Sequence, residues 1–301
     1  MSFQINTAFV QQYSTNVELL LQQKGGKLAN AVMVENFVGK AASAVEQFGA
    51  VKPIKNMARH SDTPLISTPS DKRWVFPTDY DWADLIDNQD RLRMLIDPQS
   101  PYVMNGVEAM RRAQDDIILQ AFFATSMTGE NGSTSTIWDT GQNVANTVGG
   151  AGATGLNVAK LRAGVKLLMA AGVDMESDPL FMAINAADHD NLLNEAQAIS
   201  LDYNTTPVLV NGRITAFMGI NFIHVEYGNS TYDAAATLKP STTRYVPLWA
   251  KSGMKLGIWN DVTTKVDQRA DKRYSWQVYI TATYGATRLQ ENKVVQVACE
   301  D

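Results

Sequence analysis

The sequence contains few of the residues that build common chemical sites. Its 301 residues include one cysteine, Cys299, which excludes an intrachain disulfide and gives no sign of a thiolate metal site. The three histidines, His60, His189 and His224, are far apart in the sequence and form no ligand-spaced pair. No Gly-x-Ser-x-Gly elbow and no Gly-Lys-Ser/Thr phosphate loop occurs. We therefore expect no catalytic residue, no cofactor, no metal and no enzymatic activity.

An excess of basic charge and a long apolar run are also missing. The formal net charge is -5, which argues against a dedicated nucleic-acid-binding domain. No apolar run approaches a bilayer span, and the first residues lack the pattern of a signal peptide, so we expect an aqueous, reducing compartment and no membrane. Residues 1–60 carry six basic and three acidic side chains, which makes the N-terminal arm mildly basic. A hydrophobic content of 45% is enough for a sizeable core.

The clearest helix is expected over residues 101–126, where apolar side chains recur at helical spacing. Two pairs of opposite charge lie four residues apart in it, Arg111 with Asp115 and Arg112 with Asp116. Such pairs are typical of the solvated side of a helix, so we expect these four side chains to face water.

A strand with an aromatic face is expected over residues 72–82. Pro77 restricts it to a sheet edge or a two-stranded ribbon, which together with the preceding extended stretch predicts a long hairpin. An isolated hairpin is marginally stable in water, so its aromatic face should pack on the parent domain or on a neighbouring subunit. The aromatic residues of that face, our candidate intersubunit contacts, are Trp74, Phe76, Tyr80 and Trp82.

The end of the chain alternates between apolar and polar residues over 274–286, which predicts a long half-buried strand. A charged turn at 267–273 precedes this strand, and a second strand is expected over 294–299. Across the chain, helices and strands mix without a regular strand-helix-strand cadence. The expected fold class is therefore α+β.

Three weaker motifs have a functional and a plain interpretation. Gly150–Gly155 fits a dinucleotide-binding pattern, but no convincing strand precedes it, and a mobile linker explains it better. His189 is flanked by two aspartates, as a general base would be and as a helix-start histidine commonly is. An acidic ladder lacks the spacing of a calcium loop and favours a solvated face; it comprises Asp79, Asp81, Asp84, Asp87 and Asp90.

The order of these pieces resembles that of the major capsid proteins of tailed bacteriophages. Residues 208–225 resemble the central-domain strands of that family. Residues 271–299, with a charged turn, a long strand, Gly285-Ala-Thr-Arg288 and a final Val-Val strand, resemble its ending.

The resemblance implies a division of the chain into five segments. The spine helix at 101–126 and the long strand at 274–286 would belong to a peripheral domain. The implied segments are an N-terminal arm at 1–44, an extended loop at 45–85, the peripheral domain at 86–179 and 246–301, and an axial domain at 180–245.

The resemblance also implies the function. A major capsid protein self-assembles into pentamers and hexamers of an icosahedral shell that encloses double-stranded DNA through non-specific contacts, with portal, scaffold or cement proteins as further partners. It would be made in the host bacterial cytoplasm and end in the virion capsid. Two alternatives stay open: the shell protein of an encapsulin-type compartment, and a nucleotide-binding enzyme that uses Gly150–Gly155.

Overall fold

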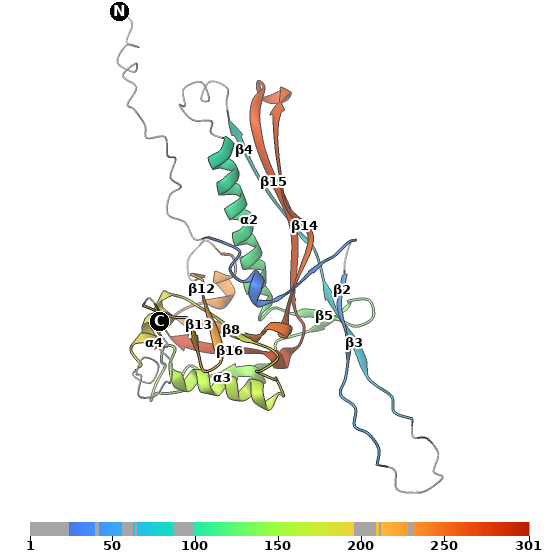
Figure 1. Cartoon of the computed structure of the whole chain (residues 1–301), viewed down its shortest axis with the longest axis vertical. Helices are drawn as coiled ribbons and strands as arrows, with labels where there is room; N and C mark the ends of the chain where they lie inside the picture. The colour runs from blue at the N-terminus through green and yellow to red at the C-terminus, as the bar shows by residue number, and fades with distance from the viewer. Residues whose placement is uncertain are drawn as a thin grey trace, which may run out of the picture.

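A long helix lies along a sheet of long strands and forms the upper part of the molecule (Figure 1). The computed structural model describes residues 24–39, 42–55, 63, 65–86, 99–195, 209–210, 212–227 and 232–300. The helix is α2 (Gln99–Ala121). The sheet runs in the order β1 (Met33–Asn36), β14 (Met254–Arg269), β15 (Ser275–Arg288) and β4 (Thr78–Ile86), with β1 parallel and β4 antiparallel to its neighbour.

The expected alternation of the long C-terminal strand is confirmed. On β15, Val278, Ile280 and Ala282 are fully buried, whereas the residues between them, Tyr279 and Thr281, are partly exposed. This face packs against α2, where Gly106 leaves room for it: a side chain there would come within 2.6 Å of the Trp82 ring. The outward face carries hydroxyl and carboxylate side chains, such as the Tyr279 hydroxyl, which donates to Asp81 at 2.7 Å.

The expectation that Asp115 and Asp116 face water on α2 is wrong. Asp115 is fully buried and accepts backbone N–H bonds from Lys27 at 3.1 Å and Leu28 at 3.0 Å. Asp116 is also buried and accepts the N–H of Ala234 at 2.9 Å. A carboxylate can accept the N–H bonds of a chain segment that has no other backbone partner, so these two aspartates fasten other segments to the helix.

The lower part is a six-stranded sheet with its own core. Its order is β11 (Ala216–Phe217), β12 (Ile220–His224), β8 (Leu180–Ile184), β13 (Thr243–Ala250), β16 (Val294–Glu300) and β7 (Asn143–Val144). Helix α3 (Val158–Ala170) packs on one face, with Leu161, Val165 and Leu168 inward as their spacing predicts. It ends at Gly172, whose φ of 84° is the left-handed conformation that glycine favours.

Shorter elements complete this domain. Helix α4 (Ala186–Leu193) starts with a capping box, in which Asn185 and Asp188 bond each other's backbone N–H. A small hairpin is formed by β9 (Leu209–Val210) and β10 (Arg213–Ile214), and α6 (Ala235–Leu238) leads into β13. No helix among the described residues is both long and apolar enough to cross a membrane.

The remaining sheet contains the long hairpin, in the order β2 (Ala42–Phe48), β3 (Ser70–Val75), β5 (Ser126–Thr128) and β6 (Thr134–Thr136). The expectation of one continuous strand over 72–82 is wrong. Phe76 and Pro77 separate β3 from β4, and β4 lies beside β15 in the sheet of long strands. Proline has no N–H to give to a ladder, so the chain leaves one sheet there and joins another.

The link between these two sheets passes close to Gly285 on β15. A side chain at Gly285 would meet the carbonyl oxygen of Phe76 and come within 2.8 Å of Val75. Only a residue without a side chain allows the backbone of the link to pass this close. Gly257 on β14 lies opposite Gly285, and a side chain there would come within 2.6 Å of the Phe37 ring.

Candidate assembly surface

The β2–β3 hairpin and the chain that continues from both strands run out from the body (Figure 1). Large apolar side chains on it face water: Phe48 is 71% exposed and Leu65 is 97% exposed. Val51, Ile54 and Ile66 are exposed as well. Several large apolar side chains exposed on one projecting element favour a protein-protein contact.

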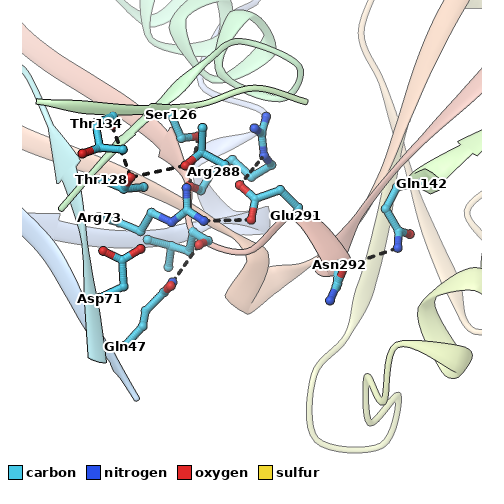
Figure 2. A network of polar contacts seen from close by, with 12 residues as sticks. Gln47, Asp71, Arg73, Ser126, Thr128, Thr134, Gln142, Arg288, Glu291 and Asn292 are labelled. Atoms are coloured by element: carbon cyan, nitrogen blue, oxygen red, sulfur yellow. Dashed lines mark hydrogen bonds and ion pairs between the residues drawn. The ribbon is translucent and has the colours of Figure 1, made fainter. Parts of the chain in front are cut away.

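The base of the hairpin is tied to the body by a polar network, shown in Figure 2. Arg73 on β3 donates to Glu291 at 2.8 Å, and Gln47 on β2 donates to the carbonyl of Leu289 at 2.7 Å. Glu291 also lies 3.6 Å from Arg288. Both strands of the hairpin are therefore fixed to the corner between β15 and β16.

Arg288 connects this corner to the end of the spine helix. Its guanidinium is fully buried and donates to the carbonyls of Phe122 at 2.6 Å and Ala124 at 2.9 Å. It also lies over the Trp138 ring, 5.0 Å from the ring centroid. α2 ends at Ala121, before the expected residue 126, and these bonds give partners to two carbonyls of the chain just beyond the helix.

Burial lowers the pKa of the Arg288 guanidinium from its ordinary value, and the nearby Arg73 adds to this effect. The opposing charge of Glu291 acts in the other direction. An arginine remains charged even so, so the corner holds two buried cations against one carboxylate. An open groove of about 550 Å³ lies beside it, lined by Phe48, Pro69 and Arg73 of the hairpin and by 290–292.

The four predicted contact residues do not share one face. Trp74 on β3 donates its indole N–H to the carbonyl of Gly129 at 2.7 Å and packs on Gly132. Tyr80 and Trp82 lie on β4 and pack against the core below α2. Phe76, in the link, is 48% exposed. The role of these four residues between subunits stays a prediction. The sequence did not indicate the exposed apolar residues of the hairpin as contact residues, because their spacing around Pro53 follows no regular period.

The other sequence motifs have local structural partners. Lys160 donates to the carbonyl of Thr154 at 2.6 Å, and the start of α3 is capped by Asn157, which accepts the N–H of Lys160 at 2.8 Å. The Asn157 oxygen thus takes a helix-start N–H that a nucleotide phosphate would use. Two residues of the acidic ladder accept hydroxyl bonds from β15, Asp79 from Thr283 and Asp81 from Tyr279.

The predicted residues Asp87, Asp90 and His60 lie outside the described residues, as does the N-terminal arm before residue 24. His189 and His224, far apart in the sequence, are brought together with their ring centroids 4.9 Å apart. Sequence spacing alone gave no sign of this pair, because it joins a helix and a strand of different segments. No group of three potential metal ligands occurs in the described part of the chain.

The fold is a mixed α+β fold with a projecting hairpin anchored at the corner between β15 and β16. A family profile described as "Phage capsid protein" matches residues 5–301. The chain therefore belongs to the phage capsid protein family, and its role is that of a structural protein in a phage head. The expected α+β capsid-type fold is confirmed.

Solved structures share this fold over nearly the whole chain. The head protein of Helicobacter pylori bacteriophage KHP40 has a TM-score of 0.74 at 8% identity, covering 99% of this chain and 98% of that one. The capsid of cyanophage P-SCSP1u gives 0.67 at 13% identity, covering 99% and 94%. The mature capsid of bacteriophage PhiM1 gives 0.66 at 11% identity, covering 96% and 91%. The comparison with curated proteins finds no match.

Proposed function

We propose that copies of this chain form the pentamers and hexamers of an icosahedral shell, and that the β2–β3 hairpin is the arm by which each subunit contacts its neighbour. The observation that carries this proposal is the combination of exposed apolar side chains, on Phe48 and on the chain beyond the two strands, with strands that Arg73 and Gln47 fix to the body. A hairpin that is already held in place loses less conformational entropy when it binds a neighbouring subunit than a flexible one would.

The division into domains follows from the same proposal. The predicted peripheral domain, 86–179 and 246–301, includes the helix and the long-strand sheet, and the predicted axial domain, 180–245, would lie at the centre of each capsomer. The six-stranded sheet joins strands of both, because β7 and β16 come from the ranges predicted as peripheral. Phe76, exposed where β3 leads into β4, is the predicted aromatic contact that stays available to a neighbouring subunit.

Assembly of hairpin variants tests the proposal. Phe48→Ser and Leu65→Ser remove exposed apolar surface, so the subunit should fold with unchanged stability while shell formation, followed by light scattering and electron microscopy, fails or slows. Met169→Ser, which alters a side chain that is 60% exposed on α3, is the matched control and should assemble normally. Normal shells from both hairpin variants would show that the arm is not the contact.

We further propose that the shell encloses double-stranded DNA held by backbone charge contacts, with portal, scaffold or cement proteins as further partners. Particles purified after nuclease treatment should then contain protected DNA. Particles that hold a protein cargo and no DNA would instead favour the encapsulin-type compartment.

A further inference from the structure

Two histidines from different elements bond the main chain of one buried residue, Ile214 on β10. The N–H of Ile214 donates to Nε2 of His189, on α4, at 3.3 Å. Nε2 of His224, on β12, lies 3.4 Å from the carbonyl oxygen of Ile214. The Ile214 side chain is fully buried in the core of the six-stranded domain, and the two rings meet edge to face.

These bonds require a different proton arrangement on each ring. An imidazole nitrogen that accepts an N–H bond carries no proton, so neutral His189 has its proton on Nδ1. His224 must carry a proton on Nε2 to donate to the Ile214 carbonyl. A doubly protonated His224 can still donate to the Ile214 carbonyl. In a doubly protonated His189, the Nε2–H faces the Ile214 N–H, and no hydrogen bond can form between the two donors.

The surroundings of the pair oppose added positive charge. Lys27, from the chain before β1, donates its amine to the carbonyl of His224 at 2.8 Å, and Arg213 precedes Ile214 on β10. Burial lowers the pKa of His224, and the positive charges of His189, Arg213 and Lys27 lower it further, against the bond to Ile214.

The nearby carboxylates are engaged elsewhere. Asp188 is bonded to Arg244 at 2.8 Å, and Glu226 accepts the N–H of Ala186 at 3.2 Å. Asp190, the other acidic neighbour of His189 on α4, is exposed. Among the described residues no carboxylate bonds either imidazole ring, so neither ring has an anionic partner that would stabilise its charged form.

We propose that His189 and His224 form an acid-sensitive latch that holds the β9–β10 hairpin in the domain at neutral pH and releases it when His189 is protonated. Protonation of His189 removes the acceptor for the Ile214 N–H, leaves that buried group without a partner, and places a cationic ring against His224. This regulation goes beyond the proposed shell function and does not depend on the β2–β3 arm.

The sign of the pH effect follows from the acceptor role of His189 Nε2, because the bond from the Ile214 N–H exists only while that nitrogen carries no proton. The lowered pKa of His224 acts in the same direction, since the fold favours the neutral form of that ring and loses this stabilisation in acid. The latch is therefore closed while both rings are neutral and opens in acid.

Hydrogen exchange of the full-length protein tests the latch. Exchange rates of the peptide that contains Ile214, corrected for the intrinsic pH dependence, are compared at about pH 8 and about pH 5 by mass spectrometry. We expect the protection of this peptide to fall by about tenfold in acid while that of β8 stays constant. Constant protection of the Ile214 peptide, or an equal loss in β8, would overturn the proposal.

Two substitutions separate the histidines. In His189→Gln the amide oxygen can accept the Ile214 N–H and does not titrate, so protection should persist in acid. In His224→Gln the residue that switches is still His189, so the acid loss should remain, as it should in His60→Gln. Equal acid loss in His189→Gln and wild type would overturn the proposal. If His189→Gln does not fold, the wild-type comparison of the Ile214 peptide with β8 decides.

Discussion

At the scale of single residues, Trp82 shows how burial separates two roles of an aromatic side chain. Its ring packs against α2 at Gly106 and belongs to the core that Ile280 also joins. We expect Trp82→Ala to lower the free energy of unfolding of the unassembled subunit by about 3 kcal/mol, because the lost contacts leave a cavity. Urea unfolding followed by circular dichroism measures this change.

Phe76→Ala is the matched control, because Phe76 is exposed where β3 leads into β4. It should change the free energy of unfolding of the subunit by less than about 0.5 kcal/mol. A Trp82→Ala subunit that is as stable as wild type yet fails to assemble would instead place Trp82 at a contact between subunits.

Asp115 and Asp116 mark the limit of sequence reasoning at this scale. Their spacing from Arg111 and Arg112 predicts surface ion pairs, yet both carboxylates are buried on backbone N–H groups from segments more than eighty residues away. Local spacing cannot reveal a partner that only tertiary structure brings near. The same reason hid the contact between His189 and His224.

At the scale of elements, the strands that were predicted share one property: one face is buried and the other is not. β15 and β16 carry that pattern in their residue types, and both appear where they were expected. β14 was missed as a strand of sixteen residues. Its second half is mostly polar and exposed, and two register shifts interrupt its pairing, so no clean period survives in the sequence.

The end of α2 and the base of the hairpin depend on one side chain, and this gives an element-scale prediction. Arg288→Ala removes the donors to Phe122 and Ala124 and leaves Glu291 with one cation fewer. Breaking a buried charge network of this kind should cost about 3 kcal/mol in the free energy of unfolding of the subunit. Chemical denaturation of the unassembled subunit measures it.

Arg111→Ala provides the comparison, since Arg111 is an exposed arginine on the same helix that pairs with Glu108 at 3.2 Å. An exposed pair contributes about 0–1 kcal/mol, so this variant should remain close to wild type in stability. Similar losses in both variants would mean that Arg288 does not hold the corner.

At the scale of the whole molecule, the proposed contacts differ in their physical nature. The arm offers apolar side chains, whereas DNA retention would depend on phosphate charge. We expect added salt to weaken the retention of packaged DNA more steeply than it weakens shell formation, because counter-ions screen only the charge contacts. Light scattering and nuclease-protected DNA, measured over one salt series, give the two slopes, and equal slopes would contradict this division.

The anchor of the hairpin also has a consequence for the order of events during synthesis. Arg73 bonds a residue 218 positions later in the chain, and Gln47 bonds one 242 positions later. Until the ribosome has delivered residues 289–291, the early hairpin has its partners on β5 but lacks its bonds to the corner between β15 and β16. Its apolar side chains then lie on an arm that is not yet fastened to the long-strand sheet. We therefore expect association in the correct geometry to follow the translation of the anchor.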